Sequence, residues 1–365
     1  MTISNTKSLA IPLWIISTGV IIVFLIAAKK LLIPMVIAIG IWYLIESVSR
    51  AMQRIKIDKN KNRKMPRWLT LILSSISIIG VLVFGVKILV DHFRTMVSSV
   101  SKYEDQLQKV LDQLSRVLPI ESGMSFMEFI EQYDFGTLVG PVFDTVANVA
   151  MSLILVLIYV IFLLLERNVL KQKLTNLIRD GSSYKNFLKV LGKINQSIRT
   201  YISVKVFTSF LTGFLSYLVM EFFGLDFAVL WAFIIFLLNF IPSIGSITAT
   251  SLPLLFSLIQ FGSFGTFILL LILIVGIQIL VGNYLDPMMM GSRLNISPLV
   301  ILFSLVAWGS MWGFAGMIFS VPIMAVLIII FAQFESTRFI SILLSADGNI
   351  DVEDLGKPKS TGKGN

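Results

Sequence analysis

The stretch of the chain from residue 206 to residue 334 is almost free of charge. Its 129 residues hold four charged side chains, Glu221, Asp226, Asp286 and Arg293. In a soluble domain about one residue in four is charged, so a segment of this length would carry several times as many. Runs this apolar are typical of segments that span a lipid bilayer. The sequence therefore predicts an integral membrane protein.

Two polar, glycine-containing breaks interrupt these apolar runs. One covers residues 239–245, Asn-Phe-Ile-Pro-Ser-Ile-Gly, and the other covers residues 308–313, Trp-Gly-Ser-Met-Trp-Gly. Backbone groups that are freed at such breaks must face protein, water or a ligand, because lipid cannot satisfy them. We therefore predict broken helices in this half of the chain.

The composition excludes several kinds of chemistry. The 365 residues are 56% hydrophobic and include no cysteine and a single histidine, His92. Disulfides, thiolate catalysis and Cys-rich or His-rich metal sites are therefore excluded. The sequence has no P-loop and no Gly-x-Ser-x-Gly or His-Glu-x-x-His motif. We predict a protein that is not an enzyme and that uses no cofactor or metal.

The charged residues are distributed as in a membrane protein. Residues 50–67 contain eight basic residues and one acid, and residues 166–205 contain nine basic residues and two acids. Residues 91–144, in contrast, contain four basic residues and nine acids. Basic segments beside apolar spans stay on the cytoplasmic side. The net charge of +9 therefore indicates membrane topology, not nucleic-acid binding. Both termini are expected in the cytoplasm.

The first half of the chain divides into three predicted segments of an all-α fold. Residues 1–90 form membrane helices, with a hairpin of spans at 9–28 and 31–48 and a cytoplasmic loop at 50–67. Residues 91–145 form an extracytoplasmic helical segment. Its apolar residues repeat every seven positions from Phe93 to Leu114, which predicts a seam that packs either within one protomer or against a neighbour. Residues 146–205 form a membrane helix followed by basic amphipathic helices that lie at the cytoplasmic interface.

The carboxy-terminal half is predicted to be built twice. In residues 206–334, each unit has a span, an apolar run, a break, and a further run with a proline, Pro253 in one unit and Pro322 in the other. We expect two inverted units, with either three crossings or re-entrant hairpins in each, and the short runs beside the breaks favour re-entrant hairpins. The chain then has about eight membrane helices or hairpins. Residues 335–365 are predicted to be a mostly disordered cytoplasmic tail.

Asp286 is the first candidate for a coupling or ion site. It precedes Pro287, which lacks an N–H and disfavours helix at Asp286, so carbonyls just upstream are expected to lose their partners. A carboxylate beside free carbonyls suits a cation or a proton. The alternative is an ion pair between Asp286 and Arg293 that only shapes the turn.

Neutral polar and small residues around the breaks are candidates for a transport path, although such residues also serve close helix packing. They are Asn239, Pro242, Ser243, Gly245, Thr248, Ser251, Asn283, Ser304, Ser310 and Gly313. Glu221 and Asp226 flank Gly224 at the outer end of a span, and we expect both in water.

At the two breaks the sequence resembles the AI-2E family of bacterial transporters. The resemblance is carried by residues 239–258, with the Ile-Pro-Ser-Ile-Gly core, and by residues 283–326, with Asp286-Pro287, Trp308-Gly309 and Val321-Pro322. Ser246 stands where many members have proline. The resemblance implies a multi-pass protein of the bacterial inner membrane that forms homo-oligomers. It also implies export of a small polar signalling molecule such as autoinducer-2, or exchange of sodium or lithium for protons.

Three functions follow from the sequence. The first is a secondary or passive transporter that exports a small polar solute. The second is a Na⁺(Li⁺)/H⁺ antiporter, which requires a protonatable site. The third is a scaffold of the cell envelope or of sporulation that transports nothing, although a scaffold needs neither paired breaks nor intramembrane hydroxyl groups.

Overall fold

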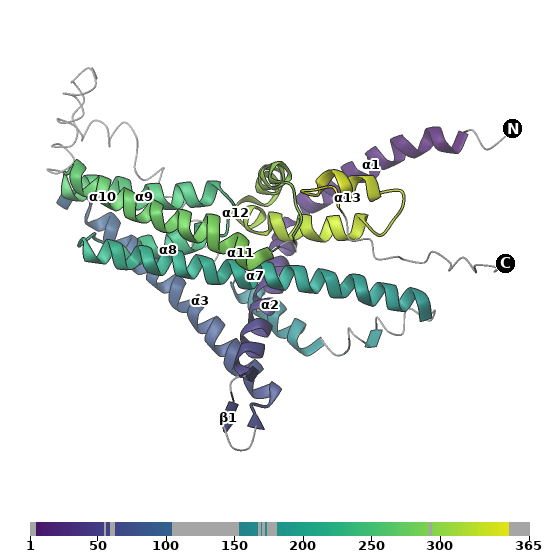
Figure 1. Cartoon of the computed structure of the whole chain (residues 1–365), viewed down its shortest axis with the longest axis horizontal. Helices are drawn as coiled ribbons and strands as arrows, with labels where there is room; N and C mark the ends of the chain where they lie inside the picture. The colour runs from purple at the N-terminus through teal and green to yellow at the C-terminus, as the bar shows by residue number, and fades with distance from the viewer. Residues whose placement is uncertain are drawn as a thin grey trace, which may run out of the picture. The chain divides into compact units, whose positions relative to one another are not determined.

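The computed structural model is helical throughout its long elements, as predicted (Figure 1). It describes residues 5–54, 56–58, 63–103, 153–166, 169, 172–173, 181–291 and 294–349. Six described helices are long and apolar enough to span a membrane. They are Lys29–Arg54, Arg67–Met96, Asn186–Phe222, Ile244–Phe261, Phe264–Met290 and Pro298–Phe331, beside the shorter apolar helices Pro12–Ala27, Leu153–Glu166 and Ala228–Leu238. The prediction of a polytopic membrane fold is confirmed.

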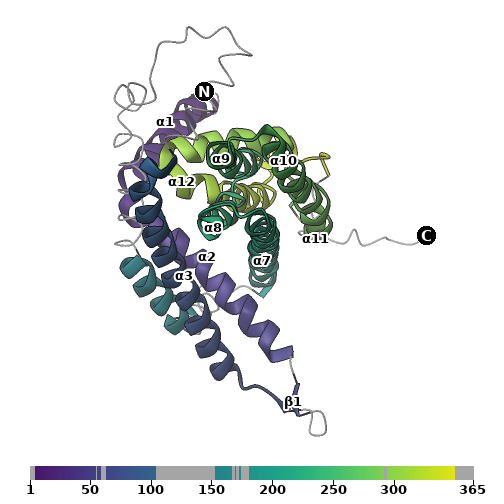
Figure 2. The same cartoon turned by 90° about the vertical axis from the view of Figure 1, so that its left-hand side faces the viewer.

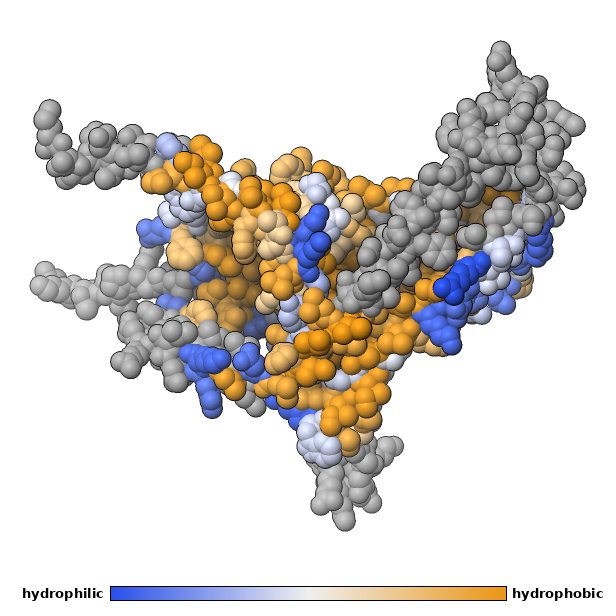
Figure 3. Space-filling model, turned by 180° about the vertical axis from the view of Figure 1, so that it is seen from behind, coloured by the Kyte–Doolittle hydropathy of each residue, from blue (hydrophilic) through white to orange (hydrophobic). Residues whose placement is uncertain are grey.

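Apolar side chains lie on the surface of the described helices. Trp14, Leu299 and Phe303 are all exposed, and Figure 3 shows apolar residues over much of one face of the molecule. In water such a surface would promote association, whereas lipid tails are as apolar as these side chains. The surface therefore fits a bilayer as its solvent.

The chain divides into two compact units, and helices α2 and α7 contribute residues to both. The first unit comprises residues 1–42, 155–197 and 295–365, and the second comprises residues 43–154 and 198–294. The predicted inversion of the two broken segments is not tested, because one segment belongs to each unit.

The first unit contains α1 (Asn5–Ala27), the start of α2 (Lys29–Arg54), α12 (Pro298–Phe331) and α13 (Arg338–Leu344). The indole Nε1 of Trp312 donates to the carbonyl of Leu25, which fastens α12 to α1. The expected hairpin between the first two spans is wrong. Helical hydrogen bonds run from Ala28 N to Phe24 O and from Leu32 N to Ala28 O, so α1 and α2 join through a bend. A reversal needs a loop of at least about two residues.

The predicted disordered tail begins with folded structure. Helix α13 packs on α12 through a bond from Ser341 Oγ to the carbonyl of Ile328. The Asn295 side chain binds Asp347 and the carbonyl of Asn349, and thus holds the turn after α13. Residues 335–349 of the tail are therefore folded, and the remaining residues of the tail, on which the predicted disorder depends, lie outside the described ranges.

The second unit contains the end of α2, α3 (Arg67–Ser98), most of α7 (Gly181–Phe222), α8 (Ala228–Leu238), α9 (Ile244–Phe261) and α10 (Phe264–Ile279). A π-helix, η2 (Leu280–Leu285), and α11 (Asp286–Met290) extend α10. Strands β1 (Lys56–Asp58) and β2 (Arg63–Lys64) form an antiparallel hairpin between α2 and α3. Figure 2 shows α7, α8 and α9 nearly end-on. Helices α7, α8, α9 and α10 share a core that includes Met220, Ile235, Ala249, Leu270 and Ile274.

Only the start of the predicted extracytoplasmic seam is described. After α3, the short 3₁₀ helix η1 (Val100–Tyr103) ends the described range. Met96 packs against the core of the second unit, and the ring of Tyr103 meets that of Phe256 edge-on at 5.3 Å. These members of the seam pack within the protomer, and the later members lie outside the described residues.

Both predicted breaks are present. Between α8 and α9, Ser243 adopts φ 59° and ψ −64°, and the N–H of Ile244 bonds to the carbonyl of Pro242 at 2.7 Å. This is a γ-turn with a positive central φ, a rare and strained form. In α12 the break is confined to Gly313, with φ 61° and ψ −140°. The predicted broken helices are confirmed.

Each break also has a glycine packed against backbone. A Cβ on Gly245 would collide with the carbonyl oxygen of Leu238, and a Cβ on Gly316 would collide with that of Trp308. Both helical segments therefore turn back closely on themselves, and only glycine leaves the space for this.

Candidate transport site

One face of α7 buries a row of polar side chains at three- and four-residue spacing. This spacing places them on one side of a helix. The row consists of Tyr201, Lys205, Thr208, Ser209, Thr212 and Ser216, all buried. We call it the polar stripe of α7. It lies in a helix long and apolar enough to span the membrane, where buried polar groups are uncommon and often mark substrate or ion routes.

A charge pair forms the centre of the stripe. Lys205 Nζ lies 2.7 Å from Asp286 Oδ2, and Thr208 Oγ1 donates to Asp286 Oδ1 at 3.1 Å. Both Lys205 and Asp286 are 8% exposed. Each carboxylate oxygen thus has a donor, and the ammonium group has a counter-charge, which offsets the large penalty of burying either ion alone.

The π-helix brings Asp286 to this position. The backbone N–H of Asp286 bonds to the carbonyl of Val281, five residues back, and Pro287 lies at the start of α11. The expectation that Pro287 disfavours helix at Asp286 is wrong, because Asp286 keeps helical angles of φ −59° and ψ −54°. A π-turn accommodates the missing N–H and the ring by adding one residue to the turn. Such turns are frequent at functional sites.

A chain of amides continues the polar network. Asn239 Nδ2 donates to Ser209 Oγ at 3.0 Å, and Gln278 Nε2 donates to Asn239 Oδ1 at 3.0 Å. Helices α7, α8 and α10 are thus connected by side-chain hydrogen bonds. Among the described residues, the buried atoms Tyr201 OH, Ser216 Oγ and Gln278 Oε1 have no hydrogen-bond partner. Unpaired buried polar atoms are costly, so these three positions suit a ligand or water.

The structure brings two of the predicted site residues to the stripe, Asn239 and Asp286. Other candidates near the first break lie apart from it. Ser243 and Thr248 are exposed, Ser251 bonds to the carbonyl of its own helix at Thr248, and Asn283 is exposed. Pro242 accepts the γ-turn hydrogen bond, and Gly245 serves the close approach to Leu238.

The candidates of the second break belong to the first unit. Ser304 is buried and bonds to the carbonyl of Ile301, whereas Ser310 is exposed and bonds to the carbonyl of Ala307. Gly313 forms the kink of α12. Arg293, the alternative partner of Asp286, lies outside the described residues. The role of these residues in a transport path stays a prediction.

Sequence reasoning missed most of the stripe. Lys205 was counted as the last residue of the basic cytoplasmic segment, yet the structure buries it against Asp286. A signal was present: Lys205 is followed by Thr208, Thr212 and Ser216 at helical spacing within an apolar span. Gln278 is likewise a polar residue inside an apolar run.

A second polar cluster connects the loops at the carboxy-terminal end of α7. This end of α7 is predicted to face the outside of the cell. Asp226 accepts hydrogen bonds from Tyr103 OH at 2.7 Å and Lys102 Nζ at 3.1 Å, while Gln260 bridges the N–H of Asp226 and the carbonyl of Gly224. The bond from Tyr103 lowers the pKa of Asp226, and partial burial raises the pKa of Tyr103. Glu221 is exposed as predicted, but Asp226 is partly buried in these contacts.

The described residues contain no group of three or more His, Asp or Glu side chains that could hold a metal ion. Together with Asp286, Asn239 and Gln278, the polar stripe offers hydroxyl, amide and paired charged groups. Such groups can exchange hydrogen bonds with a polar solute or hold a proton.

Comparison with known proteins identifies the family. The sequence model of the AI-2E family of transporters matches residues 11–336. The chain belongs to this family. The AI-2E match covers every helix of the described structure up to the end of α12 except the first residues of α1. The resemblance found at the two breaks is therefore confirmed over nearly the whole chain.

Several relatives have similar lengths. A Borreliella burgdorferi protein, provisionally named a transport protein, is 34% identical over 245 residues, 66% of this chain and 67% of the relative. A Haemophilus influenzae protein with the same provisional name is 28% identical over 337 residues, 90% and 92% of the two chains. The AI-2 transport protein TqsA of Escherichia coli is 25% identical over 338 residues, 91% and 95%. As a member of the AI-2E family with six candidate membrane spans in its described residues, the present chain is a multi-pass membrane transporter.

Proposed function

We propose that this transporter exports a small polar solute of the autoinducer-2 type, and that the polar stripe of α7 lines the route. The observation that carries the proposal is the buried Lys205–Asp286 pair within an intramembrane row of hydroxyl and amide groups. The name of the relative TqsA supports the solute class. The basic segments at 50–67 and 166–205 support a cytoplasmic position for these two segments.

The neutral part of the stripe, together with Asn239 and Gln278 beside it, suits an uncharged polar solute. Thr212, Ser216, Asn239 and Gln278 present both donors and acceptors, so they can exchange hydrogen bonds with a hydroxylated molecule. The buried atoms of Ser216 and Gln278 that have no described partner are the positions where such a solute gains most.

The charge pair supplies a means of coupling. While Lys205 and Asp286 are paired, the site is neutral overall and closed by short hydrogen bonds. Uptake of a proton by Asp286 leaves the Lys205 ammonium without its counter-charge, and loss of a proton from Lys205 leaves the Asp286 carboxylate without its counter-charge. Either change weakens the link between α7 and α11, which makes the state of the pair sensitive to a proton.

Exchange of Na⁺ for H⁺ is the second candidate function, and the same pair favours it. A metal cation that binds Asp286 and the Thr208 hydroxyl replaces the Lys205 ammonium, which then releases a proton. The scaffold hypothesis receives no comparable support from the described residues.

Flux measurements in proteoliposomes distinguish these functions. Vesicles with the wild-type protein are loaded with labelled autoinducer-2, and efflux is measured with and without a proton gradient. Proton movement on addition of Na⁺ is measured in parallel. We expect proton-dependent solute efflux that Asp286→Asn and Lys205→Met each reduce at least tenfold.

Glu221→Gln is the matched control, because it removes one acid that is exposed at a helix end. Its efflux should equal that of the wild type. Sodium-driven proton movement without solute efflux would select the antiporter. An unchanged rate of efflux in Asp286→Asn would exclude a coupling role for Asp286. If neither solute efflux nor proton movement were observed, the scaffold hypothesis would be favoured.

A further inference from the structure

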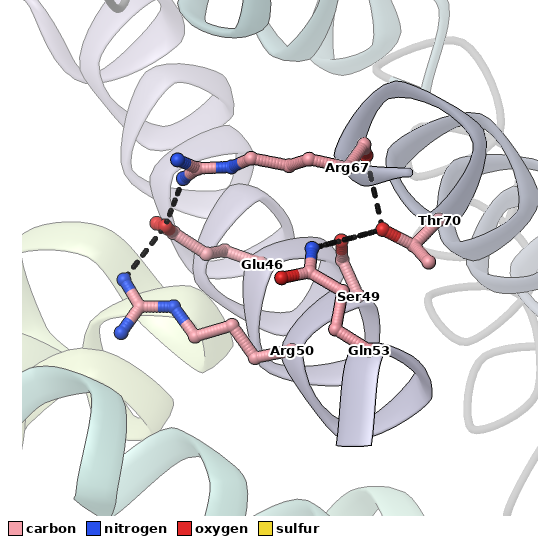
Figure 4. A network of polar contacts seen from close by, with 6 residues as sticks. All are labelled: Glu46, Ser49, Arg50, Gln53, Arg67 and Thr70. Atoms are coloured by element: carbon pink, nitrogen blue, oxygen red, sulfur yellow. Dashed lines mark hydrogen bonds and ion pairs between the residues drawn. The ribbon is translucent and has the colours of Figure 1, made fainter. Parts of the chain in front are cut away.

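A cluster of arginines surrounds a buried acid between α2 and α3. Glu46 on α2 is 6% exposed. Its Oε1 accepts from Arg50 Nη2 at 2.8 Å and lies 3.4 Å from Arg67 Nη2. Figure 4 shows the two guanidinium groups approaching the carboxylate from different sides, one from α2 and one from α3.

Hydrogen bonds beside the cluster hold its two helices together. Ser49 and Thr70 share a bond of 2.9 Å between buried hydroxyl groups, and Gln53 Nε2 donates to Thr70 at 3.0 Å. Figure 4 shows these groups beside the Glu46 carboxylate. The arginines are therefore mounted on two helices whose spacing is fixed, and a binding site needs such rigid support.

Positive charge is in excess at this position. Arg199 of α7 interacts electrostatically with Glu46 and also with Arg50 and Arg54. Among the described residues, Arg50, Arg67 and Arg199 thus share the Glu46 carboxylate, and the interactions of Arg199 with Arg50 and Arg54 are repulsive. The side chains of Arg50 and Arg67 are each about half exposed, so a further anion can reach them.

The neighbouring residues place the cluster at the surface of the membrane. Trp68, which follows Arg67, is 63% exposed, and tryptophan is enriched at the boundary between headgroups and lipid tails. Ile72 and Ile76, one and two turns further along α3, are also exposed, as expected of residues against lipid tails. Arg67 then lies at the depth of the phosphate groups.

We propose that Arg50, Arg67 and Arg199 bind the phosphate of an anionic phospholipid in the cytoplasmic leaflet. Guanidinium groups bind phosphate through paired hydrogen bonds, and anionic lipids concentrate in the leaflet that basic segments face. Glu46 limits their net charge. The acyl chains lie along the exposed apolar residues of α3. This binding does not depend on the identity of the exported solute.

Lipid binding to the full-length protein tests the site. The purified protein in neutral detergent is titrated with phosphatidylglycerol or phosphatidylcholine, and bound lipid is counted by native mass spectrometry. We expect preference for phosphatidylglycerol. The double variant Arg50→Gln/Arg67→Gln should bind it about thirtyfold more weakly, since each arginine near a membrane surface contributes about fivefold.

Two further variants separate a specific site from general charge and from loss of folding. Lys29→Gln/Lys30→Gln removes the same charge from exposed positions at the bend between α1 and α2, and it should bind like the wild type. Glu46→Gln raises the local charge and should bind phosphatidylglycerol about fivefold more tightly.

A soluble anion is the competing source of phosphate. Glycerol 3-phosphate and inorganic phosphate are therefore added as competitors. Displacement of the lipid at equal concentrations of either would overturn the lipid assignment. The site itself would be overturned if Arg50→Gln/Arg67→Gln and Lys29→Gln/Lys30→Gln lost the same affinity for phosphatidylglycerol. Weaker binding of phosphatidylglycerol by Glu46→Gln would also overturn it.

Discussion

Lys205 and Asp286 are 81 residues apart in the sequence, and the Lys205 ammonium lies 2.7 Å from the Asp286 carboxylate in the core of the second unit. A π-turn on one helix and the polar stripe on another bring them together. Their mutual neutralisation makes both charges tolerable in an apolar environment, because either one alone would be strongly destabilising.

The first prediction concerns the stability of this pair. Lys205→Met and Asp286→Asn each leave one buried charge without its partner, so each should destabilise the protein by about 3–5 kcal/mol. The double variant should lose clearly less than the sum of the two. Equilibrium unfolding in mixed detergent micelles measures all four proteins. Strict additivity would show that the two groups do not interact.

The second prediction concerns the glycines at the breaks. Gly245→Ala and Gly316→Ala place a methyl group against the carbonyls of Leu238 and Trp308, and each should destabilise by at least about 1–3 kcal/mol through overpacking. Gly276→Ala is the control, because a Cβ there meets nothing within 4 Å. It should leave the thermal transition unchanged or raise it. Equal effects at all three positions would contradict the close approach.

The third prediction concerns backbone strain at Ser243. Its φ of 59° lies in a region that glycine adopts without steric penalty. The Ser243 side chain makes no capping hydrogen bond and is exposed. Ser243→Gly should therefore stabilise the protein by about 1 kcal/mol, part of the strain stored there. The midpoint of thermal unfolding checks this, with Ser251→Gly in a regular helix as a destabilising control.

The fourth prediction concerns pH and the Asp226 contacts. The pKa of Asp226 lies below its ordinary value of 3.8 because Tyr103 and Lys102 donate to its carboxylate. A carboxyl group with a lowered pKa stabilises the fold above its unfolded pKa, and this contribution is lost as pH falls through the folded value. Tyr103→Phe should therefore destabilise the protein at pH 7 and approach wild-type stability at pH below 3.8. Thermal unfolding at a series of pH values measures the difference.

The raised pKa of Tyr103 sets the alkaline end of the pH range in which the contact between Tyr103 and Asp226 stabilises the protein. The stabilisation from the Tyr103 hydroxyl is fully present below its unfolded pKa of 10.0, and it is lost as pH rises from that value through the raised pKa of the folded state. Wild type and Tyr103→Phe should therefore also converge at strongly alkaline pH. A constant difference between them across the whole pH range would exclude this link.

The broken helices were accessible from sequence because their causes are local. A proline, a cluster of small polar residues and a glycine weaken a helix wherever they occur, and Gly245 and Gly313 were identified on that basis. Asp286 was found because an acid in an apolar run is unusual. The bend between the first two helices was missed, since Lys29-Lys30 looks like a loop between spans but keeps helical hydrogen bonds around Ala28.

The charge-poor stretch by itself determined that this is a membrane protein with broken helices and an acid within an apolar run. The partner of that acid was decided only by tertiary structure. Lys205 stands one residue outside the stretch and was assigned to a basic loop by its neighbours in sequence. Its true environment depends on how α7 packs against α10 and α11, and on a π-turn that rotates Asp286 towards it. Local pattern sets where helices break, whereas the burial and pairing of charges far apart in the chain require the packed helices.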